Sequence, residues 1–426
     1  MTSATINRHE RWMSTEVVSG PLSVLLGATN ALIFFFGPLD LSADGDTMTV
    51  GIDPIVAMKL IVFAIAASLA VYGFLTSSAV RQILQTPPVL VLYALLCLVL
   101  IAGPGAVSSA SIPTTLINFA SIGFVATALV GLGVNRFALA GLIGCLVSVL
   151  LAIFLYYVVP RYGVFPEHLA DGLIVYRLGG VAHPNSVSRS ACLGLIMAIY
   201  LYRTRVLSWR YSIFLILVFL IAIYMSFSRT AILASGLALI VLVARQLQSR
   251  IALMSVTFAV MTGILLLMSL VAFGREDIVV DKVLAKLSKS GDVEEITSGT
   301  GRAQIWGKAV ELIGERPLIG HGFNAAPTLM EDFSQSTHNA VLHASLAGGV
   351  LAGGLMFVLL LWNVNILLTT DHILIRSITM FLLISCLMEE TVLETFAGPC
   401  TATWLLGILY APYVAIAGND QRAATT

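Results

Sequence analysis

The chain has 426 residues, of which 58% are hydrophobic and only 11% are charged, and its formal net charge is zero. A soluble domain carries roughly 25% charged residues, so a chain of this composition cannot cover its surface in water and is expected to lie in lipid. The zero net charge excludes the broad basic field by which many proteins bind nucleic acid, and we expect no nucleic-acid partner.

Long apolar runs recur along the whole sequence, and a transmembrane helix needs about 20 mostly apolar residues. The first run follows polar residues 1–19 without a convincing signal-peptide cleavage site, so we expect it to remain as an uncleaved span. The runs predict an all-α integral membrane protein, a single domain over residues 1–426 with about twelve transmembrane helices. The expected spans are 20–37, 54–76, 87–103, 112–133, 137–159, 187–202, 211–227, 230–244, 251–273, 340–362, 373–388 and 402–417.

Basic residues are distributed unequally among the loops between these spans. With a cytoplasmic N-terminus, one side of the membrane receives Arg81, Arg136, Arg203, Arg205, Arg210, Arg245, Arg250, Arg376 and Arg422. On the other side, residues 40–53 hold four Asp, residues 389–401 hold three Glu, and neither loop has a Lys or Arg. Because cytoplasmic loops are enriched in Lys and Arg, this bias predicts that both termini are cytoplasmic.

One outer loop, residues 274–338, is much longer than the others and is expected to be partly helical. Residues 281–289 place lysines opposite apolar side chains, which suits either a membrane interface or a solvated helix face. In residues 301–316 an apolar stripe has helical spacing, and Pro317 ends the predicted helix. The stripe consists of Ile305, Trp306, Val310 and Ile313.

Polar and charged residues on the outer side gather in four stretches, each next to an apolar run. They contain Arg177, His183, Asn185 and Arg189; then Arg229; then Arg302; and finally His338 and Asn339. Ionisable groups at membrane depth are costly and often mark a functional site, and the planar guanidinium of Arg suits phosphate oxygens. The stretches therefore favour a site for a lipid-linked phosphate, although a single boundary Arg can also contact lipid headgroups and a lone His can be structural.

Motifs for nucleotide or metal chemistry are not present in the sequence. It has no P-loop, no H-E-x-x-H, no G-x-S-x-G and no well-placed Asp-rich element. The five cysteines are scattered without a C-x-x-C pair and are interpreted as small core residues. We therefore expect neither a metal nor a cofactor.

The four stretches, which lie in order within residues 175–355, resemble the O-antigen ligase and polysaccharide polymerase superfamily of bacterial envelope glycosyltransferases. The matching elements are His183-Pro-Asn185, Ser228-Arg-Thr-Ala231, Gly301-Arg302 with Trp306 and Pro317-Leu-Ile-Gly-His-Gly322, and His338-Asn339 with Leu342, Gly348 and Gly349.

The resemblance implies a multi-pass enzyme of the bacterial inner (plasma) membrane with its active site facing the periplasm. Its donor would be a glycan on undecaprenyl diphosphate, and the transfer would need no nucleotide or metal. Ligases of the superfamily use the lipid A core as acceptor in lipopolysaccharide biosynthesis, and polymerases use another lipid-linked repeat unit. Only about fifteen residues separate Gly322 from His338, which leaves little room for an acceptor-binding subdomain and slightly favours a polymerase.

Roles for the candidate residues follow from the resemblance and from the chemistry of their side chains. His338 is expected to be the base, because His is the usual base near neutral pH. A clamp for the diphosphate would consist of Arg177, Arg189, Arg229 and Arg302, of which Arg229 and Arg302 are grouped with His338 as catalytic residues. The remaining substrate-binding candidates are His183, Asn185, Asn339 and Glu390, the last of which could orient His338 or an Arg.

Two other classes of function compete with the enzyme. A transporter or flippase of lipid-linked saccharides would have charged or broken helices near the bilayer midplane and an internal repeat, whereas the polar residues here cluster at one face. A non-catalytic membrane scaffold that contacts only lipids would leave the ordered Arg and His motifs without a role.

Overall fold

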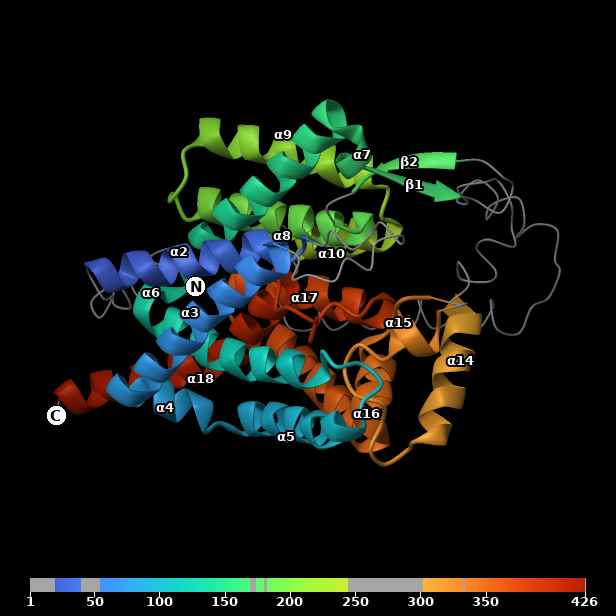
Figure 1. The fold of residues 1–426 in the computed structure, drawn as a ribbon. Coiled ribbons are helices and arrows are strands. Elements are labelled where there is room, and N and C mark those ends of the chain that lie inside the picture. The colour runs from blue at the N-terminus through green and yellow to red at the C-terminus, as the bar shows by residue number, and fades with distance from the viewer. Residues whose placement is uncertain are drawn as a thin grey trace.

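The computed structural model describes residues 20–39, 54–168, 174–179, 182–243, 302–331 and 334–425, which form a bundle of helices with one small hairpin (Figure 1). In these residues six helices are long and apolar enough to cross a membrane: α3 (Pro54–Thr76), α5 with the following turn (Pro87–Gly105), α6 (Ser111–Val158), α9 (Trp209–Ser226), α16 (Ala340–Thr369) and the start of α18 (Pro399–Ile416). Three shorter apolar helices are α2 (Pro21–Phe36), α10 (Arg229–Val243) and α17 (Ile373–Met388).

The helices coincide with the predicted spans wherever those spans are described. α6 contains two of them, 112–133 and 137–159, with a break at Gly133, whose φ is 68°. The remaining predicted span, 251–273, lies outside the described residues, as do residues 274–301 of the long loop and the predicted helix at 281–289. The total of about twelve spans and the periplasmic side of the loop therefore stay predictions.

Helix α8 (Pro184–Arg203) is less apolar than the helices against which it packs but is one of the most buried. Its first turns carry Asn185, Ser186, Ser188 and Arg189, while Cys192, Leu193 and Ile196 farther along are fully buried. It packs against α6, α9, α10 and α17. Polar groups inside a membrane bundle need protein partners, so this helix brings its polar first turns to a protein interior rather than to lipid.

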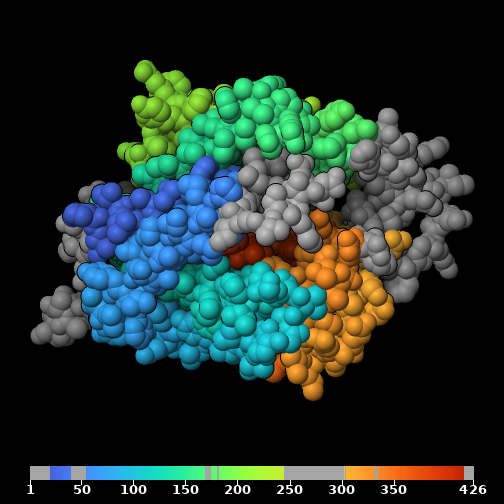
Figure 2. Space-filling view, viewed as in Figure 1, coloured from blue at the N-terminus to red at the C-terminus, as the bar shows by residue number. Residues whose placement is uncertain are grey.

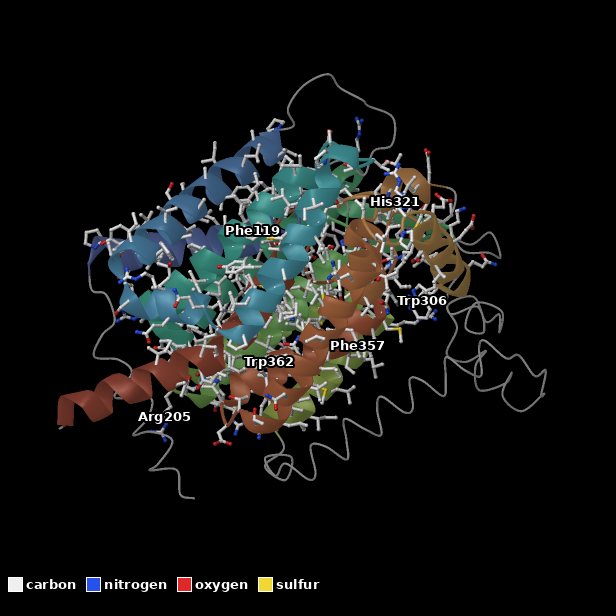
Figure 3. The ribbon with its side chains drawn as sticks, turned by 90° about the horizontal axis from the view of Figure 1, so that it is seen from below. Phe119, Arg205, Trp306, His321, Phe357 and Trp362 are labelled. Atoms are coloured by element: carbon white, nitrogen blue, oxygen red, sulfur yellow. The ribbon has the colours of Figure 1, made fainter. Side chains whose placement is uncertain are left out.

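The helices run between two ends of the molecule that differ in chemistry. Trp306 and His321 lie at one end, and Arg205 lies at the opposite end (Figure 3). At the Arg205 end, Tyr200 of α8 donates from its hydroxyl to Asn135, 2.6 Å away, and contacts His372, which directly precedes α17. We call the other end the motif end, because α8, α10 and α16 begin there and α17 ends there.

Small residues allow the helices to approach closely, as is usual where lipid supplies no hydrophobic driving force. Gly194 of α8 lies against the Phe219 ring of α9, and Gly123 of α6 lies against Ala70 of α3.

In the space-filling view, dark red residues of the C-terminal helices are visible at the bottom of a recess between blue and cyan-to-orange elements (Figure 2).

A two-stranded hairpin at the motif end is the one β element in the described residues, and the all-α prediction did not include it. β1 (Val164–His168) pairs antiparallel with β2 (Ile174–Leu178), with Phe165 opposite Arg177. Since side chains alternate along a strand, Phe165, Glu167 and Arg177 share one face of the hairpin. That face supplies Arg177 to the site described below.

Helix α14 (Arg302–Glu315) confirms the predicted helix in residues 301–316, but the buried face differs from the predicted stripe. Ile305, Ala309, Leu312 and Ile313 are buried, whereas Val310 is exposed. The helix contacts α16, and the short helix α15 (Ala326–Leu329) follows it. The stripe prediction fails at Val310 because positions 309 and 312, rather than 310, face the bundle.

The segment between α14 and α15 is joined to a break in α16 at Gly348 and Gly349. His321 and Gly322 donate their backbone N–H groups to the Leu346 and Ala347 carbonyls, at 2.7 and 2.9 Å. Val350 N–H donates to the Pro317 carbonyl at 2.8 Å. The break thus frees backbone groups that hold residues 316–322 in place, which gives the Pro-Leu-x-Gly-x-Gly run and the downstream Gly-Gly a shared structural role.

Candidate active site

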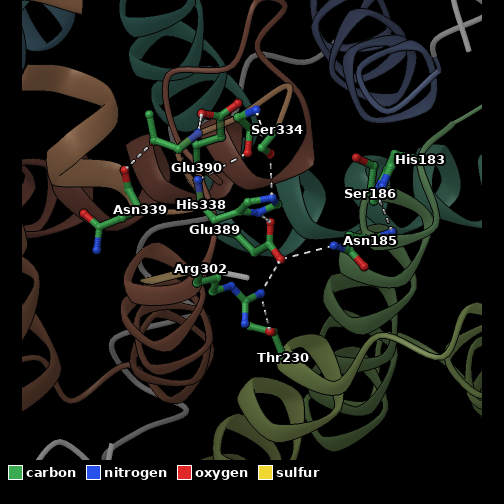
Figure 4. A network of polar contacts seen from close by, with 12 residues as sticks. His183, Asn185, Ser186, Thr230, Arg302, Ser334, His338, Asn339, Glu389 and Glu390 are labelled. Atoms are coloured by element: carbon green, nitrogen blue, oxygen red, sulfur yellow. Dashed lines mark hydrogen bonds and ion pairs between the residues drawn. The ribbon is translucent and has the colours of Figure 1, made fainter. Parts of the chain in front are cut away.

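Five segments far apart in the sequence meet at the motif end around Glu389, the residue that follows α17 (Figure 4). They are the hairpin, the start of α8, the α9–α10 turn, the start of α14 and the loop before α16. Three of the four predicted polar stretches thus meet at one carboxylate. The remaining stretch, around Arg229, joins them through Thr230, whose Oγ1 accepts from Arg302 at 3.5 Å.

His338 directly precedes the N-cap of α16 and has a left-handed backbone with φ 49°. A non-glycine residue in this conformation needs support from its surroundings, and such residues are common at functional sites. Here Ser336 Oγ accepts the His338 N–H, and Trp306 of α14 donates to the Thr337 carbonyl at 3.1 Å. The loop is therefore fixed by α14 on one side and by α16 on the other.

Both ring nitrogens of His338 have partners. Nδ1 lies 2.9 Å from Glu389 Oε2, and Nε2 lies 3.2 Å from Ser334 Oγ. A carboxylate can only accept, so Nδ1 carries the hydrogen of the neutral ring and Nε2 keeps its lone pair. An imidazole held in this way can take up a proton at Nε2, and the neighbouring carboxylate stabilises the resulting charge.

Glu389 is buried and is shared among four side chains. Its Oε1 accepts from Arg302 and from Asn185 Nδ2, both at 3.1 Å, and its Oε2 lies 3.9 Å from Arg189. Burial favours the neutral acid, but the hydrogen bond from His338, the charge that His338 carries when it is protonated and the charges of Arg189 and Arg302 outweigh burial and lower the pKa of Glu389 to about 2. The carboxylate is therefore ionised at any physiological pH.

Arg177 is buried on the hairpin face that looks toward α8. It donates to Glu167 Oε2 at 3.1 Å, to Asn185 Oδ1 at 3.0 Å and to the Ser226 carbonyl at 2.8 Å. The pKa of Arg177 is lowered from its usual value, mainly because the side chain is buried. Glu167 opposes this shift, and the charge of Arg229 adds to it. Arg229 begins α10 after a tight turn in which Phe227 has φ 49°, between the predicted spans 211–227 and 230–244.

Arg189, one and a half turns into α8, bridges two carboxylates of the α17–α18 loop. Besides Glu389 it contacts Glu394 Oε1 at 3.2 Å. Burial raises the pKa of Glu394 to about 7, although Arg189 acts against this rise. The charge of the Glu394 carboxyl group therefore changes near neutral pH.

The remaining predicted residues lie nearby but make different contacts from those expected. Glu390 accepts from Thr337 N–H and pairs with His343 Nδ1 at 2.9 Å, so Glu389, and not Glu390, contacts His338. Asn339 is the N-cap of α16 and accepts from Val341 N–H and Leu342 N–H. His183 is the N-cap of α8, and its Nδ1 accepts the Asn185 N–H.

Sequence reasoning missed four residues of this network: Glu167, Ser334, Glu389 and Glu394. Three of them are the carboxylates that neutralise the predicted arginines, so the site is not a cluster of free cations. Arg177, Arg189 and Arg302 each already face a carboxylate. A bound diphosphate would therefore have to join or exchange these ion pairs. In the described residues no group of three His, Cys, Asp or Glu side chains could hold a metal ion.

Comparison with known proteins adds one match. Residues 213–358, which include the α9–α10 turn, Arg302 and His338, match the family model described as O-antigen ligase. The match bears out the predicted resemblance to this superfamily. No curated protein and no solved structure matches the chain. The apolar helices and the O-antigen ligase match together indicate a multi-pass membrane protein of envelope polysaccharide biosynthesis.

Proposed function

We propose that the chain transfers a glycan from undecaprenyl diphosphate to a sugar hydroxyl at the periplasmic face of the bacterial inner membrane. The acceptor is either another lipid-linked repeat unit or the lipid A core, which makes the chain a polymerase or a ligase. The short connection from Gly322 to His338, whose described residues include the single-turn helix α15, favours the polymerase.

The observation that carries the proposal is the Glu389–His338 pair beside Arg302 and Arg189. In the reaction His338 Nε2 takes the proton of the acceptor hydroxyl while that oxygen forms the new bond to the anomeric carbon. The bond from this carbon to the diphosphate oxygen breaks, and the diphosphate leaves with the electron pair. Positioned arginines stabilise the charge that develops on the leaving group, so a strong general acid is unnecessary.

The proposal includes catalysis without a metal, since arginines supply the charge that a metal would otherwise provide. Transfer should then persist in excess EDTA. A loss in chelator that Mg²⁺ or Mn²⁺ restores would show that a metal takes part.

The transporter reading has weaker support. Helix α16 is broken at Gly348 and Gly349, as a transporter helix often is, but the freed backbone groups bond to residues 317–322 of the chain itself. They are therefore not directed at a passing substrate. The site also lies at one end of the helices rather than midway along them.

Separate variants test the base and the clamp. His338→Ala should reduce transfer by about two to four orders of magnitude while binding of the lipid-diphosphate donor survives, because proton removal matters only as the new bond forms. Arg229→Ala and Arg302→Ala should weaken donor binding, because charge contacts exist in the ground state as well. Normal transfer by all three variants would place the reaction elsewhere.

A further inference from the structure

Ser334 contacts the proposed reactive nitrogen of His338 (Figure 4). Its Oγ lies 3.2 Å from Nε2, the atom to which the proposed function assigns the proton of the acceptor hydroxyl. Ser334 lies four residues before His338 in the same loop, and its N–H donates to the Met330 carbonyl at 2.8 Å. The serine is thus held at this position by the backbone that follows α15.

The direction of the hydrogen bonds follows from the partners of each atom. Because Nδ1 of His338 donates to Glu389, Nε2 must accept. Ser334 Oγ accepts the Ser336 N–H at 3.2 Å, which leaves its own hydrogen for Nε2. The Ser334 hydroxyl therefore makes the same bond to the base that an acceptor hydroxyl would make.

We propose that Ser334 is a specificity-determining residue that occupies the base until a sugar hydroxyl replaces it. This inference rests on the proposed function. A glycosyl diphosphate bound without an acceptor is exposed to water, and an open Nε2 would activate water as readily as a sugar. With Ser334 in place, a single water must compete for Nε2 with a serine hydroxyl that is already positioned. An acceptor sugar that is held by its other contacts can displace the serine hydroxyl.

Transfer and hydrolysis are the same displacement with different nucleophiles. In transfer, the acceptor oxygen bonds to the anomeric carbon, its proton goes to His338 Nε2, and the lipid diphosphate leaves with the electron pair of the broken bond. In hydrolysis, water takes the place of the acceptor, and the product is a free glycan with a reducing end. The ratio of free glycan to released lipid diphosphate therefore measures how well water is excluded.

The test uses membranes of the native host lacking the chain, in which the lipid-diphosphate glycan accumulates, complemented with each variant. In ¹⁸O-water, hydrolysis places one ¹⁸O on the anomeric carbon of the free glycan, and transfer does not. The labelled fraction is the amount of ¹⁸O-labelled free glycan divided by the amount of released lipid diphosphate. We expect Ser334→Ala to raise this fraction at least tenfold. Ser334→Thr should remain near wild type, and Ser334→Val should behave like Ser334→Ala. Thr and Val have the same shape, but only Thr carries a hydroxyl.

Ser336→Ala is the matched control, because it removes a hydrogen bond to the His338 N–H in the same loop without opening Nε2. Its transfer is expected to fall because the His338 backbone loses support, but the labelled fraction should stay unchanged because Ser334 still contacts Nε2. An unchanged fraction in both Ser334→Ala and Ser334→Val would overturn the inference, and so would a hundredfold loss of transfer in both, which would make Ser334 a nucleophile or proton relay. His338→Ala, run in parallel, separates the two proposals, because normal transfer by that variant would contradict the proposed base itself.

Discussion

Glu389 and Glu390 are neighbours in the sequence but serve different histidines. Glu389 has φ −152° and ψ 155°, an extended conformation in which successive side chains point to opposite sides. One carboxylate therefore reaches His338 and the other reaches His343. The sequence shows two adjacent acids after an apolar helix, and no local pattern tells which of them faces the site, because that depends on the conformation of the residue that follows α17.

Substitution of each acid by its amide should separate their roles. Glu389→Gln keeps a hydrogen-bond acceptor for His338 but loses the charge that stabilises the protonated ring, so transfer should fall roughly 100-fold or more. Glu390→Gln, the matched control, should cost less than tenfold. The measurement is transfer from the lipid-diphosphate donor at equal protein levels. A larger effect at Glu390 would mean that the acid which supports the base is the one next to His343.

Glu394 should make stability depend on pH near neutrality. Its pKa is raised from 4.5 to about 7, so the folded protein favours the protonated acid. The stability that the protonated Glu394 gives to the folded protein is fully present below about pH 4.5. It is lost as the pH rises through about 7, to a limit of about 3 kcal/mol. In Glu394→Gln the loss should disappear.

Thermal unfolding in detergent at pH 5.5 and pH 8 measures this effect. The melting temperature of the wild type should fall more between the two pH values than that of Glu394→Gln. Equal changes in the two proteins would show that Glu394 ionises at the same pH in the folded and unfolded chains.

At the scale of the elements, the sequence predicted the helices well and the irregular backbone poorly. Apolar runs define the helices because lipid requires every backbone group to be paired within the segment. The hairpin escaped detection because its strands are only five residues each and one face packs on protein. The break in α16 lies within a continuous apolar run, and its pairing with residues 316–322 is a tertiary contact that hydropathy does not report.

Gly349 should be the position in this break least tolerant of a side chain. Its φ of 82° and ψ of 177° lie in a region that is essentially restricted to glycine, and an added Cβ would lie 2.6 Å from the Leu318 carbonyl. Gly349→Ala should destabilise the protein by about 2 kcal/mol or more. It should also reduce transfer, because residues 316–322 position α14 and with it Arg302.

Gly354→Ala provides the control on the same helix. A Cβ there meets nothing within 4 Å, and Ala is the better helix former. Its melting temperature should equal or exceed that of the wild type. If Gly349→Ala melted at the wild-type temperature, residues 316–322 could not depend on the break for their position.

At the scale of the whole molecule, the sequence anticipated that the functional stretches would gather on one side. The basic loops and the motif loops alternate along the chain, and the helices that connect them carry the motifs to one end, with Arg205 at the other (Figure 3). The sequence could not show which motif contacts which, because those contacts join residues as distant as Asn185 and Glu389. Only the packing of α8 against α17 makes them neighbours.

The same arrangement predicts the accessibility of the two ends in the cell. Gln335, exposed in the loop before His338, should lie in the periplasm, and Ser208, exposed between α8 and α9, should lie in the cytoplasm. Of the five cysteines, four are buried, so Cys97→Ala should give a parent protein that an impermeant thiol reagent does not label. In that parent, Gln335→Cys should react in intact spheroplasts, and Ser208→Cys should react only after lysis. The reverse pattern would place the Glu389–His338 pair on the cytoplasmic side, where a donor presented in the periplasm could not reach it.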